Sequence, residues 1–171
     1  DGTVFEIAKS GGGYASTPTT LVSFNGANGH SPSGTLIADS AGNLIGTTSS
    51  GGANNDGTVF EIAKTGTSYA STPTTLASFN GTDGIGPLGS LIENAAGDLF
   101  GETQTGGAYG YTNGANGYGT VFEIANTSTG YASTPIALAS LTGGAGVDGD
   151  GISPTAGLAM DAAVDLFGST S

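Results

Sequence analysis

The chain has no cysteine and no arginine, and its only basic side chains are Lys9 and Lys64. Without cysteine, neither a disulfide framework nor a thiolate metal site can form. Proteins that bind nucleic acid neutralise phosphates with many lysines and arginines. Two lysines against a net charge of -12 exclude nucleic acid as a partner. The same shortage of basic residues disfavours attraction to anionic membrane surfaces.

Long apolar runs are also missing. No stretch approaches the ~20 residues that a membrane-spanning helix needs, so we expect no membrane insertion by these residues. No window shows the i, i+3, i+4 apolar spacing of an amphipathic helix. What remains is a chain of 171 residues with 33 glycines and 9% charged residues, which is long enough for one domain with a real core.

The composition indicates where the protein acts. Abundant glycine, serine, threonine and asparagine with few charges are typical of secreted bacterial repeat proteins, so we expect an extracellular or cell-surface location. The first residue is Asp1 rather than methionine, and it lies inside a repeated motif. We therefore expect either a processed chain or part of a longer one, in which a signal or anchoring segment would lie outside these residues.

The chain is built from three diverged copies of one repeat of about 55 residues. Gly-Thr-Val-Phe-Glu-Ile begins at Gly2, Gly57 and Gly119, at spacings of 55 and 62 residues, and Tyr-Ala-Ser-Thr-Pro recurs at the same spacings. Ser-Phe-Asn-Gly and Gly-Thr-Leu-Ile-Ala-Asp-Ser-Ala-Gly-Asn-Leu-Ile-Gly-Thr-Thr also recur in constant order. We assign one repeat domain, 1–171, with copies at 1–55, 56–117 and 118–171.

Differences in copy length fall in glycine-rich stretches. The second copy carries seven extra residues within 108–118, and five more lie between 143 and 156. Loops tolerate such insertions. The predicted strands keep their lengths.

Each period predicts about four short strands. Residues 3–8 and 19–24 alternate β-branched or aromatic residues with polar ones, and 36–39 and 44–48 flank a turn at 40–43 that contains Gly and Asn. Four antiparallel strands in such a period are typical of a β-propeller blade. We predict an all-β fold of propeller-like four-stranded sheets; the alternative is a β-sandwich or a stacked-sheet solenoid.

Three of these blocks carry a resemblance to a known family. Gly-Thr-Val-Phe-Glu-Ile, Leu-Val-Ser-Phe-Asn-Gly and Gly-Asn-Leu-Ile-Gly-Thr-Thr with a following Gly-Gly resemble the tandem repeat of the bacterial GloVer family. The third copy departs from the pattern, with Val164 in place of Gly42 and Gly97 and with Leu141-Thr142 in place of Phe-Asn. The resemblance implies a secreted or surface-attached protein and supplies no catalytic residues.

The two ends of the sequence hold complementary halves of a period. Residues 156–171 carry the hairpin half, and 1–25 carry the other two strands, so we expect half-blades there. An unclosed sheet presents unpaired backbone groups that template pairing with another chain. Head-to-tail pairing of copies would build a filament or surface layer. The alternative is three periods cut from a longer ring or array.

No catalytic group stands out among the titratable residues. Glu6, Glu61 and Glu123 recur at one position, but a carboxylate pair must lie within roughly 5 to 10 Å, and successive copies put them on different sheets. We interpret them as solvent-facing strand residues. His30 is the sole histidine and lacks the partners of a serine triad or zinc site, so we interpret it as a loop residue and expect no enzyme.

Asp148 and Asp150 in Asp-Gly-Asp-Gly are calcium candidates, because alternating oxygens suit a hard cation. The downstream glutamate of a full calcium loop is missing, which favours a flexible insertion. We otherwise expect no cofactor.

Tyr14, Tyr69 and Tyr131 recur before Ala-Ser-Thr-Pro. Tyrosines in loops are candidate carbohydrate contacts, and packing of each ring against its own blade is the alternative. Asn80 and Asn126 match the N-glycosylation pattern. A carbohydrate-binding module therefore stands beside a self-assembling structural protein as the second functional hypothesis.

Overall fold

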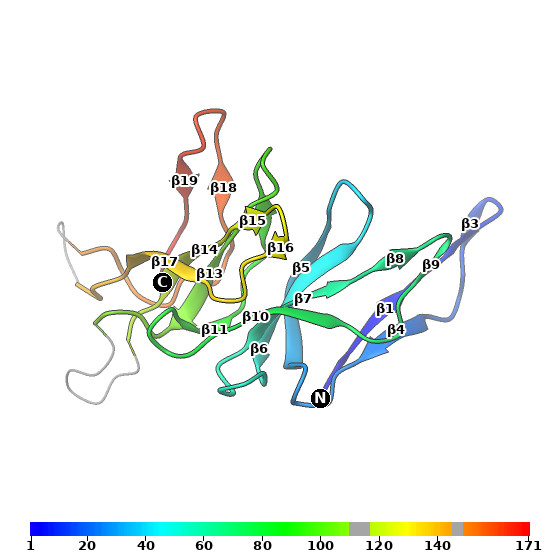
Figure 1. Ribbon diagram of the computed structural model, residues 1–171, viewed down its shortest axis with the longest axis horizontal. Helices are drawn as coiled ribbons and strands as arrows, with labels where there is room; N and C mark the ends of the chain where they lie inside the picture. The colour runs from blue at the N-terminus through cyan, green and yellow to red at the C-terminus, as the bar shows by residue number, and fades with distance from the viewer. Residues whose placement is uncertain (110–116, 145–148) are drawn as a thin grey trace.

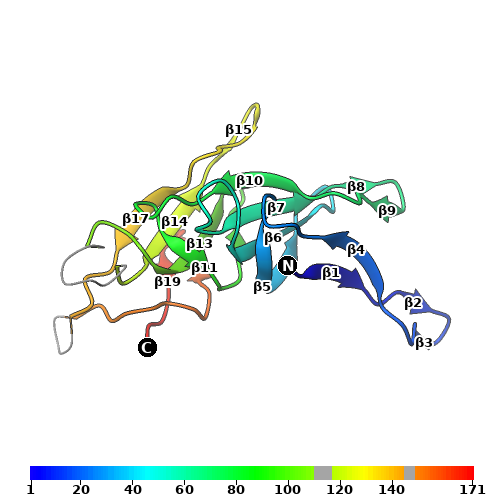
Figure 2. The ribbon, with the colours of Figure 1, turned by 90° about the horizontal axis from the view of Figure 1, so that it is seen from below.

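The computed structural model describes residues 1–109, 117–144 and 149–171. Within these ranges the chain forms strands and no helix, so the predicted all-β class is confirmed. The described part accordingly has no helix long and apolar enough to cross a membrane. The strands form several small antiparallel sheets that follow one another along the long axis of the molecule (Figures 1 and 2).

The first sheet lies at the right of Figure 1, and the second sheet lies near the centre of the molecule. The first sheet is a pair, β1 (Thr3–Glu6) with β4 (Thr19–Ser23). The second sheet has four strands in the order β10-β7-β6-β5. Its strands are β5 (His30–Ala38), β6 (Leu44–Ser50), β7 (Thr58–Ile62) and β10 (Thr74–Ser78).

The third sheet repeats the second one, and a hairpin follows it. In the third sheet the order is β11-β13-β14-β17, with β12 also paired to β13. Its strands are β11 (Ile85–Pro87), β12 (Ile92–Glu93), β13 (Leu99–Thr105), β14 (Thr120–Ile124) and β17 (Ile136–Ser140). The C-terminal hairpin pairs β18 (Ala159–Met160) with β19 (Leu166–Phe167).

Three two-residue ribbons extend from the sheets, and the sequence did not predict them. Each ribbon follows the Gly-Thr-Val-Phe-Glu-Ile strand and ends on the recurrent tyrosine. The ribbon strands are β2 (Lys9–Ser10), β3 (Gly13–Tyr14), β8 (Lys64–Thr65), β9 (Ser68–Tyr69), β15 (Asn126–Thr127) and β16 (Gly130–Tyr131).

Neighbouring sheets pack face to face. Since alternate residues of a strand point to opposite faces of its sheet, strand β7 contacts a neighbouring sheet on each side. Phe60 and Ile62 of β7 pack with the first sheet. Val59, which points to the opposite face of β7, packs with Leu99 and Phe122 of the third sheet. The second sheet is therefore apolar on both faces, and two core clusters join three successive sheets.

The second and third sheets each combine strands from two copies of the repeat. The hairpin β5–β6 comes from the copy 1–55, and β7 and β10 come from the next copy. The second sheet has the four strands that the repeat predicts, whereas the third sheet has five, because β11 and β12 stand where β5 is one continuous strand. The propeller-like arrangement of such sheets stays a prediction.

The hairpin turns are closed by side chains as well as by backbone. Asp39 Oδ1 accepts the N–H groups of Ala41 and Asn43 at 2.9 and 2.8 Å, and the third copy repeats the pattern around Asp161. Gly42 has φ +83° and Val164, at the equivalent position, has φ +69°. The last turn therefore keeps its geometry although a β-branched residue holds the left-handed conformation.

Candidate functional site

Within the second and third sheets, the hairpin of one repeat pairs with a strand of the next repeat, at β6·β7 and at β13·β14. We call these two places the internal junctions. Each of them has a phenylalanine ring over a glycine of the neighbouring strand. Phe60 of β7 pairs with Gly46 of β6, and Phe122 of β14 pairs with Gly101 of β13. A Cβ atom on Gly46 would lie 2.8 Å from Phe60 Cζ, and one on Gly101 would lie 2.6 Å from Phe122 Cζ. Leu36 Cδ2 would lie 2.6 Å from the first of these Cβ atoms, and Leu91 Cδ2 would lie 2.9 Å from the second. The ring and this leucine, rather than the backbone conformation, thus require glycine at these positions.

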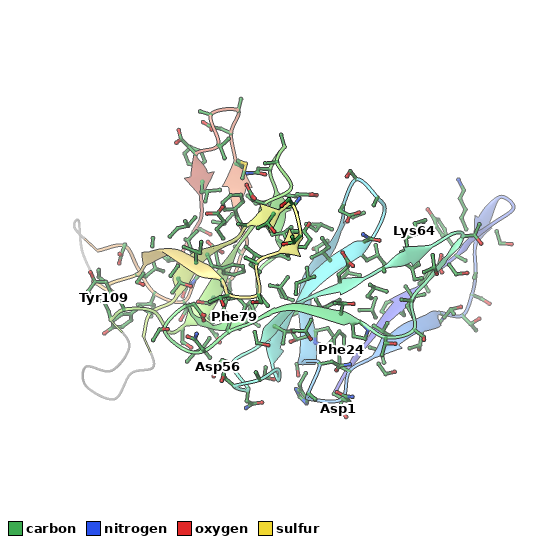
Figure 3. All side chains as sticks on the ribbon, in the orientation of Figure 1. Asp1, Phe24, Asp56, Lys64, Phe79 and Tyr109 are labelled. Atoms are coloured by element: carbon green, nitrogen blue, oxygen red, sulfur yellow. The ribbon has the colours of Figure 1, made fainter. Side chains whose placement is uncertain are left out.

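The same rings form aromatic pairs between sheets. Phe24 meets Phe60 and Phe79 meets Phe122, each pair edge to face with ring centroids 4.9 Å apart. Figure 3 labels Phe24 and Phe79 at these two junctions. Phe60 and Phe122 are both 0% exposed, and such pairs add about 0.5–1.5 kcal/mol beyond burial.

A buried pair of threonines lies beside each ring. The Oγ1 atoms of Thr48 and Thr58 are 2.8 Å apart, and those of Thr103 and Thr120 are 2.9 Å apart. All four residues are 0% exposed. Each hydroxyl thereby finds a partner, as buried polar groups require.

A third contact joins the hairpin turn to the ribbon of the next copy. The backbone N–H of Lys64 donates to Asn43 Oδ1 at 2.8 Å, and that of Asn126 donates to Asp98 Oδ1 at 2.8 Å. We call the ring on glycine, the threonine pair and this turn bond the junction contacts. They recur at both internal junctions.

The first sheet carries one half of a junction. Thr3, Phe5, Ile7 and Lys9 stand where Thr58, Phe60, Ile62 and Lys64 stand one copy later. Phe5 is 58% exposed, Ile7 is 39% exposed, and β1 pairs with no described strand except β4. Beside β1 lies a cavity of about 230 Å³, whose lining includes Val4, Pro32, Leu36 and Phe60.

The C-terminal hairpin carries the other half. Asp165, Gly168 and Thr170 stand where Asp98, Gly101 and Thr103 stand one copy earlier. Phe167 is 57% exposed, and β19 pairs with no described strand except β18. A cavity of about 190 Å³ separates this hairpin from the third sheet, and its lining includes Val121, Leu141 and Gly168.

Glu102 is a buried carboxylate in the same cavity, at the position of Thr47 in the second sheet. It is 2% exposed, and the Gly157 N–H donates to its Oε2 at 3.0 Å. Burial raises the pKa of Glu102, and the hydrogen bond from Gly157 opposes that rise. Its Oε1 lies against the face of Gly168 that a phenylalanine ring covers in the internal junctions.

The recurrent glutamates are not brought together. Glu6, Glu61 and Glu123 lie in β1, β7 and β14, on three different sheets. Glu6 is exposed, and the other two are half-buried. Burial, and then repulsion from Asp39, raises the pKa of Glu61. No general acid and base pair arises from these three residues.

His30 begins strand β5, so its interpretation as a loop residue is wrong. Register with Ser50 of β6 extends the strand to this point. Its Nδ1 lies 2.7 Å from Ser31 Oγ and 3.1 Å from Ser50 Oγ, whereas its Nε2 is 3.9 Å from Asp1 Oδ1. That last distance is too long for the oriented hydrogen bond of a catalytic triad.

The calcium candidates divide between described and undescribed residues. Asp148 lies outside the described residues. Asp150 Oδ1 accepts the Thr142 N–H at 2.9 Å and the Thr142 hydroxyl at 2.8 Å, and these hydrogen bonds lower the pKa of Asp150. Its carboxylate therefore closes a loop, and the described residues contain no group of three ligands suited to a metal.

The tyrosines lie in the ribbon strands β3, β9 and β16, not in loops. Tyr69 and Tyr131 are half-buried against the two core clusters, whereas Tyr14 is 73% exposed. Burial, followed by nearby carboxylates, raises the pKa of Tyr131 to about 12. Lys64 Nζ lies 4.8 Å from the Tyr69 ring centroid. Rings packed in this way offer little surface to a sugar.

The glycosylation candidates differ in their surroundings. Asn80 is exposed, and its Oδ1 accepts the Thr82 hydroxyl at 2.7 Å. Asn126 is also exposed, but its Nδ2 donates to Ala96 O at 3.2 Å in the neighbouring hairpin turn. The Asn126 amide is thus engaged in a junction, which leaves Asn80 the more accessible acceptor.

Sequence reasoning missed the residues of the two half-junctions as site residues. The signal was present, because phenylalanine recurs at Phe5, Phe60 and Phe122 and glycine recurs at Gly46, Gly101 and Gly168. Their meaning needs the strand register, which pairs the phenylalanine of one copy with the glycine of the preceding copy.

Comparison with known proteins gives one match. The family model of the Gloeobacter/Verrucomicrobia repeat matches residues 1–171. No curated protein and no solved structure matches the chain. The match covers all three copies, in agreement with the resemblance of their strand motifs. The chain belongs to the Gloeobacter/Verrucomicrobia repeat family.

Proposed function

We propose that this chain is an extracellular structural repeat protein that assembles head to tail with copies of itself into a filament or surface layer. One observation carries the proposal. Phe5 is 58% exposed, whereas the equivalent Phe60 and Phe122 are 0% exposed in the internal junctions. The molecule thus presents on its surface a side chain that the same repeat buries completely elsewhere.

Physical considerations favour association through these surfaces. Burying a phenylalanine contributes roughly 1.5–3 kcal/mol, and an unpaired strand edge gains backbone hydrogen bonds from a partner strand. The first sheet and the C-terminal hairpin lie toward opposite ends of the long axis (Figure 1). Their pairing therefore joins different copies, and a head-to-tail contact of this kind need not close into a ring.

The location and the blade geometry belong to the same proposal. Few charges and abundant small polar residues support a place outside the bacterial cell, where accessible Asn80 would carry a glycan if the host modifies this motif. The four-stranded meander of the second sheet supports a propeller-like blade as the unit that is stacked.

The test is the state of the purified 171-residue chain. We expect sedimentation velocity to show growing species as protein concentration rises, and electron microscopy to show long fibres. Salt near 0.15 M shortens the Debye length to about 8 Å, which limits repulsion between copies of net charge -12. Monodisperse single chains at every concentration would overturn the proposal.

Carbohydrate binding has one feature in its favour, the exposed ring of Tyr14. A glycan array separates the two functions. Saturable binding that Tyr14→Ala removes, while Tyr69→Ala and Tyr131→Ala retain it, would support a sugar-binding role. Fibres without glycan binding would support the structural role.

A further inference from the structure

We propose that strand β1 of one molecule pairs antiparallel with strand β19 of the next molecule, in the register of the internal pairs β6·β7 and β13·β14. This inference rests on the proposed head-to-tail assembly and names the strands and residues that meet. In that register Phe5 faces Gly168, Thr3 faces Thr170, and Ile7 faces Leu166. The junction formed between two molecules then has the same contacts as the internal junctions of a single molecule.

The first support is a reciprocal fit of aromatic rings and cavities. The exposed Phe5 ring does not cover a glycine as Phe60 and Phe122 do, and the side chain nearest to Gly168 is Glu102 instead of a phenylalanine. The cavity of about 190 Å³ beside Gly168 is bounded by Val121 and Leu141. These residues stand where Val59 and Phe79 pack with Phe122 in the internal junction.

The fit holds in the opposite direction as well. Phe167 stands at the position of Ile45 and Phe100, which are 0% and 6% exposed, but is itself 57% exposed. In the proposed pairing the Phe167 ring enters the cavity of about 230 Å³ beside β1 of the other molecule. Each end of the molecule therefore has one exposed phenylalanine ring and one cavity that the ring of another molecule can fill.

The second support is the threonine pair. At both internal junctions the two hydroxyls lie within 2.9 Å and are fully buried. Thr3 and Thr170 are exposed and have no hydroxyl contact with each other in a single copy. The register places them opposite one another and gives each the partner that its equivalents have.

The third support is charge complementarity. Lys64 extends over the turn of the preceding hairpin, where a Cβ atom on Gly42 would lie 3.0 Å from its Cδ. Lys9 stands at the position of Lys64 in the repeat. In the proposed pairing, Lys9 of one molecule therefore extends over the turn that contains Asp161 and Asp165 of the next molecule. One of only two lysines in a chain of net charge -12 then lies over a turn that holds two carboxylates.

Glu102 is the one side chain that stands in the way. Its carboxylate occupies space beside Gly168 that the Phe5 ring requires. Thr47 holds the same position in the second sheet, and the atoms nearest to the corresponding face of Gly101 belong to Phe122 and Leu91. Glu102→Thr therefore strengthens association several-fold, whereas Thr47→Ser, a change inside a complete junction, leaves it unaltered.

Disulfide trapping tests the register, because the native chain has no cysteine. The variant Thr3→Cys/Thr170→Cys is oxidised and run on a non-reducing gel, and its association is first checked under reducing conditions. We expect a ladder of linked dimers, trimers and longer chains. The matched control, Glu6→Cys/Thr170→Cys, moves one thiol about 10 Å along the strand, beyond the span of a disulfide, and gives no ladder.

The outcomes separate the register from the assembly itself. If the wild-type chain assembles and neither variant gives a ladder, or both give equal ladders, the register is wrong while assembly stands. If the wild-type chain stays a monomer, both proposals fail. A ladder that is confined to the paired variant establishes the register.

Substitutions at Phe5 and a charge reversal at Lys9 and Asp165 give readouts that do not depend on cysteine chemistry. Phe5→Ala, at an exposed position, weakens association roughly ten- to a hundredfold, and Phe5→Leu retains most of it. Lys9→Glu and Asp165→Lys each weaken association, and a mixture of the two variants recovers it, because their reversed charges meet at mixed junctions. Unchanged association in Phe5→Ala, or no recovery in the mixture, would contradict the pairing.

Discussion

Phe60 in the middle of the molecule and Phe5 near one end occupy the same place in the repeat, yet they differ completely in burial. Phe60 is 0% exposed between two sheets, and Phe5 is 58% exposed on the outer face of the first sheet. Their local sequences are identical, Gly-Thr-Val-Phe-Glu-Ile. The difference teaches that burial in this fold comes from the neighbouring copy, as in other proteins whose repeats contact only their neighbours.

The sharpest way to break this comparison is to remove the ring at each place. Phe122→Ala should lower the free energy of unfolding by about 3–5 kcal/mol, because it leaves a cavity between the second and third sheets. Phe5→Ala should lower it by less than about 0.5 kcal/mol in the monomer. Urea unfolding at a concentration at which the chain is monomeric measures both. Equal losses would show that Phe5 is buried in solution.

The glycines that face these rings give a second, smaller contrast. Gly101→Ala should cost about 1–3 kcal/mol, since the new Cβ would lie 2.6 Å from Phe122 Cζ and 2.9 Å from Leu91 Cδ2. Gly168→Ala should change monomer stability little, because its new Cβ meets the movable end of Glu102. Thermal unfolding of the two variants compares them. A larger loss from Gly168→Ala would contradict the half-junction.

The last hairpin turn offers a stabilising change. Val164→Gly should stabilise the C-terminal hairpin by about 1 kcal/mol, since it removes the cost of a left-handed β-branched residue, ~1–2 kcal/mol, against the added chain entropy of glycine, ~0.5–1 kcal/mol. Val164 is 50% exposed, so little apolar burial is lost. Hydrogen exchange of the β18 and β19 amides measures the gain. The reverse change Gly97→Val should loosen the turn before β13, and equal exchange in both turns would sink the interpretation.

Glu102 gives the smallest effect and a dependence on pH. Burial raises its folded pKa above the ordinary value of 4.5, so the folded state binds this proton more readily and its stability rises as pH falls through that folded pKa. Glu102→Gln should remove this dependence and add on the order of 1 kcal/mol or less at pH 7. Unfolding measured from pH 7 down to pH 4 checks it. A gain that persists undiminished at pH 4 would point to packing rather than charge.

Much of the strand framework was predictable from the repeat. Residues 3–8 and 19–24 were predicted as strands, and the structure has β1 at Thr3–Glu6 and β4 at Thr19–Ser23. The hairpin around 40–43 was also predicted, and β5 and β6 flank it. Alternation of side chains and turn residues are local signals, so a sequence carries them directly.

The ribbons and the junction contacts were not predictable in the same way. A two-residue pair such as Lys64–Thr65 with Ser68–Tyr69 is too short to show alternation, so the tyrosines were assigned to loops. Glu102 gave no sign of burial, because Thr47 stands at its position in the preceding copy. Its 2% exposure follows from the packing of the C-terminal hairpin on the third sheet.

The sequence by itself determined the strands, the turns and the periodicity of this protein, because each depends on residues close together in the chain. Only the tertiary structure decided which phenylalanine meets which glycine, since that pairing joins strands of adjacent copies. It also decided that Phe5 and Gly168, whose equivalents meet inside the molecule, are both exposed. Burial is a property of the neighbour as much as of the residue, and a neighbour has a position only in the folded chain.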